Sequence, residues 1–251
     1  MSWYAQSKYD LRFEWGLEGA KNLGPQTDLA IIVDVLSFST CVDIAVSSGV
    51  EVYPFPFKDD RVQAFAESIG AICASPTRSK DVVCLSPSTL LRLQDGAKLV
   101  LPSPNGATIS FALQNHTVMT GCLRNASAVA NMAQTLGEKI VVIACGELWE
   151  DGTLRPSLED MIGAGSIISK LQGRASPEAT AATQVFQHFH RSLEDAIARS
   201  SSGQELISLG FAEDVAIASA LDVSRAAPIL HEGAFKTALG RATDVSADAP
   251  R

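Results

Sequence analysis

The chain has 251 residues, of which 46% are hydrophobic and 19% charged, so it is long enough to bury a core without disulfide or metal support. Its 20 Lys and Arg residues against 28 Asp and Glu residues give a net charge of −8. This charge and an aromatic content of only 6% argue against nucleic acid or an anionic membrane as a partner. The five cysteines form no CxxC pair, and their odd number favours a reducing compartment, so we predict a cytoplasmic protein.

Short apolar runs rich in β-branched residues alternate with segments of helical period along most of the chain. This is the pattern of βα units, so we predict an α/β fold with a mostly parallel sheet and one domain over residues 1–251. No apolar run approaches the roughly 20 residues that span a bilayer. The predicted strands are 29–36, 50–55, 71–74, 98–101, 117–120 and 139–145, with a late candidate at 227–231.

The predicted helices lie between and after these strands. Residues 172–226 are expected to be mainly helical, with one long helix over 176–200, and the small, polar residues 242–251 are expected to be frayed. The segment Gly163-Ala164-Gly165 lies inside a helical pattern and lacks the third glycine of a dinucleotide site, so it indicates close helix packing. The predicted helices are 39–48, 59–69, 86–93, 106–114, 125–136, 157–171 and 176–200.

Asp34 interrupts the apolar run of the first predicted strand, and Ser37, Ser39 and Thr40 follow it at a helix start. Burying a carboxylate in an apolar strand is costly without a cation or hydrogen-bond donors, so Asp34 is a candidate functional residue. Backbone N–H groups at a helix start, together with hydroxyls, favour phosphate, which makes the three hydroxyl residues candidate phosphate ligands. A simple N-cap role explains the serines equally well.

Two further loops that follow predicted strands carry candidate phosphate contacts. Asn105 and Gly106 allow a close approach of the backbone to a ligand, or form an ordinary tight turn. Arg124 is placed to hold a phosphate through two parallel hydrogen bonds, although a lone surface arginine is more common. Asn125 beside it is expected to cap the next helix.

The loop 145–160 contains five carboxylates and one arginine, and this density of charge is the strongest single feature of the sequence. Glu147 and Glu159, together with Asp34, could supply the hard oxygen ligands that Mg²⁺ prefers. Asp160 is a further candidate ligand, although its S-x-x-D spacing also fits a capping box.

Several familiar catalytic motifs are absent from the sequence. There is no GxxxxGK[ST] loop, and the four histidines show no serine-hydrolase or zinc spacing. The spacing from Cys73 to Arg78 is one residue too short for a cysteine phosphatase, and Cys145 has no arginine at that distance. Cys145 is therefore either a nucleophile of another kind or a small buried hydrophobe.

Four motifs in order resemble the 2-phosphosulfolactate phosphatase family: VDVLSFST from Val33, PSPNGAT from Pro102, GCLRNASAVA from Gly121, and SLED at the end of the acidic loop. The match covers most of residues 29–171. The resemblance implies a three-layer α/β/α sandwich with a mostly parallel or mixed sheet. It also implies a Mg²⁺-dependent phosphatase that converts 2-phosphosulfolactate, or a related small 2-phospho acid, to the hydroxy acid and phosphate in coenzyme M biosynthesis.

The resemblance also suggests residue roles. Asp34, Glu147, Glu159 and Asp160 would hold Mg²⁺, and Ser39, Thr40, Asn105, Gly106, Arg124 and Asn125 would contact phosphate. The attacking group stays open between a metal-activated water and a covalent role for Asp34 or Cys145, with Glu159 a further catalytic candidate.

One residue departs from the family pattern. Ser37 stands where many relatives carry an arginine, and Arg124 or Arg155 could replace that charge. The expected partner is a small acidic phosphorylated metabolite. The alternative is a catalytically silent protein that binds a phospho acid. The oligomeric state stays open, although enzymes of this size are often symmetric homo-oligomers.

Overall fold

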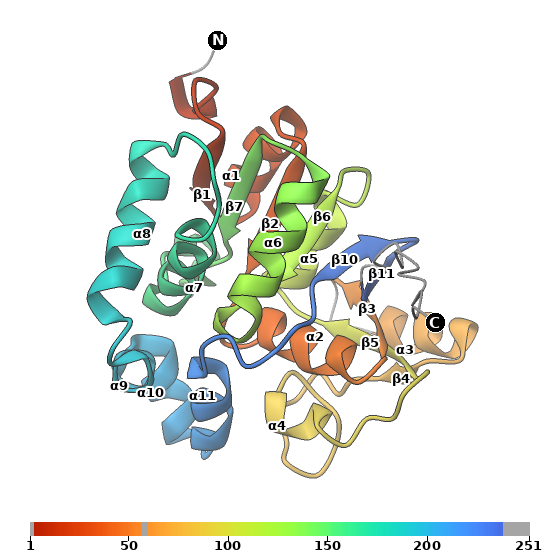
Figure 1. Ribbon diagram of the computed structural model, residues 1–251. Coiled ribbons are helices and arrows are strands. Elements are labelled where there is room, and N and C mark those ends of the chain that lie inside the picture. The colour runs from red at the N-terminus through yellow and green to blue at the C-terminus, as the bar shows by residue number, and fades with distance from the viewer. Residues whose placement is uncertain (1–2, 57–59, 238–251) are drawn as a thin grey trace, which may run out of the picture.

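A large mixed sheet and a small separate hairpin form the strands of the protein, whose structure, a computed structural model, describes residues 3–56 and 60–237 (Figure 1). The strands are β1 (Leu11–Trp15), β2 (Leu29–Val33), β3 (Glu51–Phe55), β4 (Ile72–Cys73), β5 (Lys98–Pro102), β6 (Val118–Gly121), β7 (Ile140–Ala144), β8 (Glu147–Leu148), β9 (Leu154–Arg155), β10 (Pro228–His231) and β11 (Ala234–Thr237). The sheet has nine strands in the order β1-β7-β2-β6-β10-β11-β3-β5-β4, and β8 pairs only with β9.

Helices connect most of these strands and make up most of the C-terminal third of the described chain. The α-helices are α1 (Gly16–Leu23), α2 (Phe38–Ser47), α3 (Asp60–Ile69), α4 (Pro87–Leu90), α5 (Gly106–Ala112), α6 (Ala126–Leu136), α7 (Leu158–Ile168), α8 (Pro177–Phe189), α9 (Leu193–Arg199), α10 (Ser201–Ser208) and α11 (Ala212–Ser219). Short 3-10 turns cover Trp3–Ala5, Gly24–Gln26 and Leu123–Asn125. Among the described residues, none of these helices combines the length and apolar character needed to span a bilayer.

The predicted α/β fold is confirmed, and each of the seven predicted strands is present. The first strand and helix, β1 and α1, were not predicted, nor were β8, β9 and β11. β1 was missed because its sequence, LRFEW, mixes charges with aromatics, yet it pairs in parallel with β7 along its whole length. The expected frayed end at 242–251 lies outside the described residues.

The hairpin of β10 and β11 divides the sheet into two parallel groups. β1, β7, β2 and β6 are parallel to one another, as are β3, β5 and β4. Three successive antiparallel pairings separate β6 from β3, so the two groups do not share one strand direction. The loops after β2 and β5 nevertheless meet, as the hydrogen bond from the Gly106 N–H to Asp34 Oδ2 at 3.1 Å shows. The sheet, expected to be mostly parallel or mixed, is therefore mixed, and the loops after β2 and β5 meet within it.

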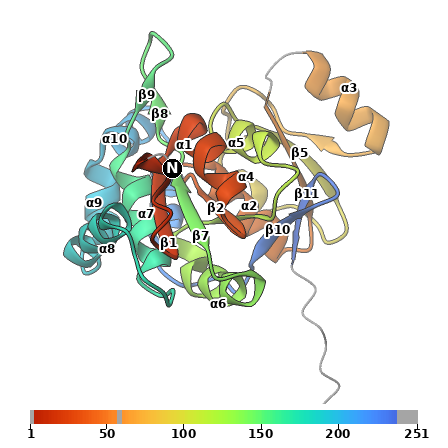
Figure 2. The ribbon, with the colours of Figure 1, turned by 90° about the horizontal axis from the view of Figure 1, so that it is seen from above.

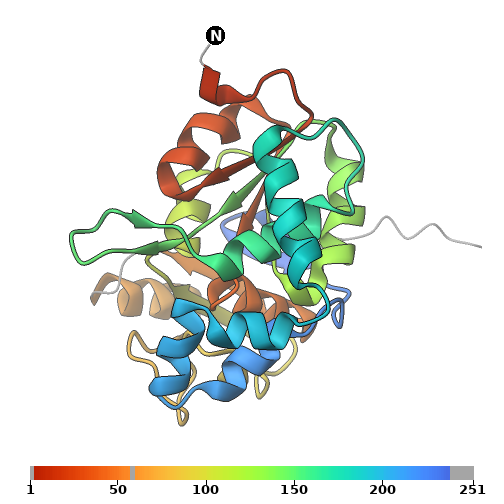
Figure 3. The same ribbon diagram turned by 90° about the vertical axis from the view of Figure 1, so that its left-hand side faces the viewer.

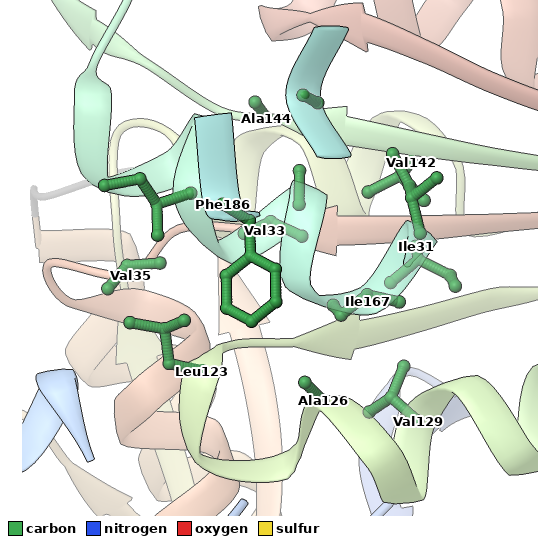
Figure 4. Close-up of a cluster of buried hydrophobic side chains, with 14 of the residues drawn as sticks. Ile31, Val33, Val35, Leu123, Ala126, Val129, Val142, Ala144, Ile167 and Phe186 are labelled. Atoms are coloured by element: carbon green, nitrogen blue, oxygen red, sulfur yellow. The ribbon is translucent and has the colours of Figure 1, made fainter. Parts of the chain in front are cut away.

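Helices cover both faces of the sheet, as the three-layer architecture requires. Alternate residues of β2 point to opposite faces: Ile31 and Val33 pack with α6, α7 and α8, while Ala30 and Ile32 pack with α1, α2 and α5. Figure 4 shows part of the first of these clusters, which includes Val33 of β2 and Phe186 of α8. All five residues of β2 are buried, which places the strand end at Val33 deep inside the molecule.

The single long helix predicted over 176–200 is wrong, because the chain breaks into α8 and α9 after Phe189. The polar stretch 190–192 forms a turn in which the Ser192 N–H donates to the Phe189 carbonyl at 2.8 Å. After this turn the chain continues as α9, and Phe186 of α8 and Leu193 of α9 both belong to the same core cluster. The following helices, α10 and α11, lie beneath α7 and α8 in Figure 1.

The predicted close packing at Gly163-Ala164-Gly165 is present between α7 and α8. A Cβ atom at Gly165 would overlap the carbonyl oxygen of Ala182, and one at Gly163 would lie 2.6 Å from Val35 Cγ2. Ala182 and Val35, which make these two contacts, are both completely buried.

We therefore expect Gly165→Ala to destabilise the fold by about 1–3 kcal/mol, because the added methyl group overpacks the contact between the two helices. Thermal unfolding followed by circular dichroism measures the effect. The sign of the change in stability distinguishes a crowded from an uncrowded site, because Gly→Ala in an uncrowded helix raises stability by up to about 1 kcal/mol. A higher melting temperature in this variant would contradict the packing.

Candidate active site

A cavity of about 250 Å³ opens at the ends of β2 and β5, beside β8. Four residues singled out in the sequence line it: Asp34, Ser37, Asn105 and Glu147. Arg78, in the loop before α4, and four residues of the segment 202–209 also line it, and none of these was predicted. The cavity therefore joins the sheet to the C-terminal helices.

Asp34 is the central carboxylate of this cavity and is only 5% exposed. Its Oδ1 accepts the Phe38 N–H at 3.0 Å, and its Oδ2 accepts the Gly106 N–H at 3.1 Å. These N–H groups belong to the first residues of α2 and α5, so two positive helix ends face one carboxylate. Burial raises the pKa of Asp34 to about 6, with a smaller rise from Glu159, although both backbone donors oppose it. Gly106, expected to contact phosphate, instead holds Asp34.

The hydroxyls of Ser39 and Thr40, predicted as phosphate ligands, are completely buried and bond to the protein itself. Ser39 Oγ accepts the Asp34 N–H at 2.9 Å, and Thr40 Oγ1 donates to the Val35 carbonyl at 2.8 Å. Neither lines the cavity, because both are used to close the turn between β2 and α2. Ser37 is the hydroxyl residue of this group that lines the cavity.

Asp160 holds the ends of β2 and β7 together. Its Oδ1 accepts the Val35 N–H at 2.7 Å, and its Oδ2 accepts the Gly146 N–H at 2.9 Å and the Ser157 hydroxyl at 2.8 Å. Burial, followed by the charges of Asp34 and Glu159, raises the pKa of Asp160 well above its usual range. The predicted capping box is not formed, because Ser157 donates to this carboxylate and makes no side-chain cap bond. Asp160 is not among the residues that line the cavity, so the expected metal role is not supported and the residue positions the strand ends.

Glu147 and Asn105 form a pair on the cavity wall. The Asn105 side-chain amide donates to Glu147 Oε2 at 2.9 Å, so the predicted phosphate ligand orients a carboxylate. Burial, and then the negative charge of Asp34, raise the pKa of Glu147 to about 7. The negative charges of Asp34 and Glu147, which both line the cavity, are therefore close enough to repel each other.

Glu159, expected as a metal ligand and a catalytic residue, lies in the first turn of α7 and is 2% exposed. It is not among the residues that line the cavity. Its negative charge nevertheless raises the pKa of Asp34, Glu147 and Asp160. Glu159 therefore adds negative charge behind the cavity wall, and a direct contact with a ligand is not supported.

The buried acidic set has the chemistry of a site for a hard cation, since a bound cation removes the mutual repulsion of its carboxylates. Within the described residues, no three His, Cys, Asp or Glu side chains are grouped so that they could hold one ion by themselves. Mg²⁺ is commonly bound by one or two carboxylates together with water and substrate phosphate. Asp34 and Glu147, which both line the cavity, fit that mode.

Arg124 and Asn125 lie away from the cavity and have structural partners. Arg124 Nε donates to Asp43 Oδ2 at 2.9 Å, and its Nη1 donates to the Ile217 carbonyl at 3.2 Å. Asn125 Oδ1 accepts the Cys122 N–H at 2.8 Å, so the side chain braces the turn before α6 and does not cap the helix as predicted. Arg124 has Asp43, which is fully buried in α2, as its counter-ion, and Asn125 is used within its own turn. The expected phosphate role of both residues is therefore unsupported.

Arg155 lies in the β8–β9 hairpin, which stands out from the body of the molecule (Figures 2 and 3). Its Nη2 donates to the Ser202 hydroxyl at 3.3 Å, and its guanidinium lies 5.7 Å from the centre of the Trp149 ring. Ser202 lines the cavity and Arg155 does not. Arg155 therefore links the hairpin to α10 at the cavity edge.

Arg78 is the arginine that lines the cavity, and the sequence analysis missed it. Its Nη2 donates to Ser37 Oγ at 3.4 Å, and its Nη1 lies 3.2 Å from Asp214 Oδ2. Arg124 or Arg155 was expected to replace the arginine that many relatives carry at the position of Ser37. In the structure the positive charge beside Ser37 comes from Arg78 instead. Arg78 lies in an irregular loop with no strand end or helix start beside it, so no local sequence pattern pointed to it.

Cys145 is buried and lines a second cavity, of about 390 Å³, and not the one that contains Asp34. Burial, followed by the nearby charges of Asp34 and Asp160, raises the pKa of its thiol well above the usual range. The thiol is therefore protonated near neutral pH, and the alternative of Cys145 as a nucleophile is not supported.

Comparison with known proteins identifies similar chains. Residues 19–233 match the family model described as 2-phosphosulpholactate phosphatase. The 2-phosphosulfolactate phosphatase of Methanothermobacter thermautotrophicus is 29% identical over 208 residues, covering 82% of this chain and 88% of the relative. The probable 2-phosphosulfolactate phosphatase of Carboxydothermus hydrogenoformans is 31% identical over 209 residues, covering 80% and 85%. The 2-phosphosulfolactate phosphatase of Methanocaldococcus jannaschii is 28% identical over 202 residues, covering 76% and 84%.

The burial of the cysteines leads to a prediction about their reactivity. Cys41, Cys84, Cys122 and Cys145 are buried, while Cys73 is partly exposed. In the native protein we expect Ellman's reagent to label one thiol quickly, and Cys73→Ser to abolish that fast phase. Labelling of Cys145, identified by mass spectrometry before unfolding, would contradict its assignment as a buried, protonated thiol.

Proposed function

This chain belongs to the 2-phosphosulfolactate phosphatase family, and we propose that it is a phosphomonoesterase that hydrolyses 2-phosphosulfolactate, or a closely similar 2-phospho acid, to the hydroxy acid and phosphate. The observation that carries this proposal is the cavity beside Asp34. Its described lining combines three carboxylates, Asp34, Glu147 and Glu205, with one cationic group, Arg78, in a space of about 250 Å³. A small and highly acidic substrate fits that volume and that arrangement of charge.

We propose that Mg²⁺ is the metal of this site, held by Asp34 and Glu147. When bound, the ion would balance the charge of the phosphoryl oxygens and supply a water of lowered pKa as the attacking group. The donor chemistry supports this, because two carboxylates with a third behind them are costly to bury as anions without a cation. The site is not a closed protein cage, so phosphate oxygens would complete the coordination.

The protein's own residues keep this site in one geometry. The Phe38 and Gly106 N–H groups hold both oxygens of Asp34, and the Asn105 amide holds one oxygen of Glu147. Side chains held in this way lose little freedom when a ligand binds, which favours a precisely oriented phosphoryl group. In the proposed reaction a water oxygen attaches to phosphorus, the ester P–O bond breaks, and the hydroxy acid leaves with a proton.

The proposal predicts a metal-dependent reaction. Phosphate release from 2-phosphosulfolactate and 2-phospholactate should require Mg²⁺ and stop in EDTA. Mg²⁺ alone should also raise the melting temperature, because a ligand that binds only the folded state stabilises it. Measurements of phosphate release and of thermal unfolding in Mg²⁺ and in EDTA test the two expectations separately.

The outcome in EDTA decides between the candidates. Full activity in EDTA would exclude the metal. Binding of a phospho acid without phosphate release, measured by calorimetry, would favour the catalytically silent protein instead.

The metal ligands can be tested by isosteric substitution. Asp34→Asn and Glu147→Gln should each lower kcat/KM by more than about 100-fold, because loss of a direct ligand exceeds the 10–100-fold cost typical of its outer partners. Both should also remove the Mg²⁺-induced rise in melting temperature.

Glu150→Gln is the matched control, because Glu150 is an exposed acid in the same hairpin and outside the cavity. Unchanged turnover and Mg²⁺ response in Asp34→Asn would show that the central assignment is wrong. A loss in Glu150→Gln equal to that in Glu147→Gln would show that net charge, and not ligation, is responsible.

A further inference from the structure

We propose that Arg78 determines substrate specificity by binding the acid group of the substrate that is not transferred, a carboxylate or sulfonate. This inference rests on the proposed function, because it concerns the same cavity. It assigns to the loop before α4 and to the C-terminal helices a role that no sequence motif indicates.

The described wall of the cavity has one positively charged side chain. Among the described residues that line it, Arg78 is the one Lys or Arg side chain, and Asp34, Glu147 and Glu205 are acidic. A metal held by Asp34 and Glu147 would attract the phosphoryl group to that side. A second acid group on the same molecule then needs a cation elsewhere on the wall, and Arg78 is the cation that the wall provides.

Arg78 has more hydrogen-bond donors than its described contacts use. An arginine side chain has five N–H donors, and the described contacts of Arg78 use one on Nη1 for Asp214 and one on Nη2 for Ser37. The side chain is 21% exposed and lines the cavity. Three N–H groups therefore stay available, and a planar guanidinium matches the paired oxygens of a carboxylate or sulfonate.

Contacts within the protein hold Arg78 in place before any ligand binds. Asp214 of α11 is completely buried and accepts hydrogen bonds from the Ser88 N–H at 3.0 Å and from the Ser86 hydroxyl, as well as from Arg78. The guanidinium also lies 5.5 Å from the centre of the Phe211 ring. An arginine fixed by a buried carboxylate and an aromatic ring loses little entropy on binding an anion.

These contacts make Asp214 and Phe211 positioning residues for Arg78. Both belong to the segment that leads into and forms α11, far in the sequence from the loop that carries Arg78. The helices after α7 therefore contribute to recognition of the substrate and do more than cover the sheet.

The test compares two esters that differ in one group. In 2-phospholactate a carboxylate occupies the place of one methyl group of isopropyl phosphate. For Arg78→Gln we expect KM for 2-phospholactate and 2-phosphosulfolactate to rise roughly 10- to 100-fold, the range for losing one or two charge-assisted hydrogen bonds. KM for isopropyl phosphate should change less than about threefold, since that ester offers Arg78 no anion beyond the phosphoryl group.

Lys80→Gln is the matched control. Lys80 is in the same loop and lies 5.9 Å from the centre of the same Phe211 ring, but it is exposed and does not line the cavity. This variant should leave the ratio of kcat/KM values for the two esters unchanged. Arg78→Lys should keep part of the preference for the acidic ester, because it keeps the charge without the planar donors.

Loss of folding in Arg78→Gln is separated from loss of recognition by a second variant. Arg78→Gln leaves Asp214 buried without its cation, which is destabilising. The double variant Arg78→Gln/Asp214→Asn removes both charges, and we expect it to fold and still to lack the preference for 2-phospholactate. Equal loss of activity toward both esters in the folded double variant would overturn the proposal.

Calorimetry with sulfolactate, the product acid, separates this inference from the proposed function. Sulfolactate should bind the wild type at least about tenfold more tightly than Arg78→Gln. If no ester is hydrolysed but this difference is seen, the phosphatase proposal fails and the role of Arg78 stands. If the esters are hydrolysed and sulfolactate binds both proteins equally or not at all, Arg78 is not the specificity residue.

Discussion

The geometry of the site depends on one buried carboxylate that never reaches the cavity. Asp160 accepts the N–H of Val35 beyond β2, the N–H of Gly146 beyond β7, and the hydroxyl of Ser157 at the start of α7. Loops that leave neighbouring strands otherwise diverge, and their backbone N–H groups would be buried without partners. By satisfying three donors at once, Asp160 places Asp34 and Glu147 on one wall, because each of these residues directly adjoins one of the tied loop residues.

The residues around Asp160 also concentrate negative charge in a buried part of the protein. Asp34, Glu147, Glu159 and Asp160 act on one another, and burial raises the pKa of each of the three whose shift is resolved. The protein offsets part of this cost with dipoles, through the helix starts at Phe38 and Gly106, and the rest of the cost is the reason for proposing a bound cation. Arg78, which is held by Asp214, supplies a positive charge on the wall of the same cavity. A site that binds an acidic phosphate ester needs both elements.

The places where the sequence interpretation was right share a physical cause. Strand runs such as 29–33 and 140–144 are buried on both faces, so they are uninterrupted apolar stretches, and Asp34 stands out at the end of one. Where the interpretation was wrong, a polar side chain had a partner inside the protein, in some cases close in the sequence and in others distant. Ser39 and Thr40 close their own turn, Arg124 pairs with Asp43 across 81 positions, and Arg78 pairs with Asp214 across 136. Local pattern contains no information about such partners.

The sequence by itself therefore determined the α/β class, the seven strands first predicted, the acidic loop and the position of Asp34, because these follow from hydrophobic periodicity and from the cost of an isolated carboxylate in an apolar run. Only the tertiary structure decided which hydroxyls and arginines face the cavity, that α10 helps to form it, and that Asp160 positions the strand ends. The reason is that the partner of a polar side chain is decided only when distant segments meet. Arg124 is held by Asp43 away from the cavity, whereas Arg78 lines the cavity while paired with Asp214.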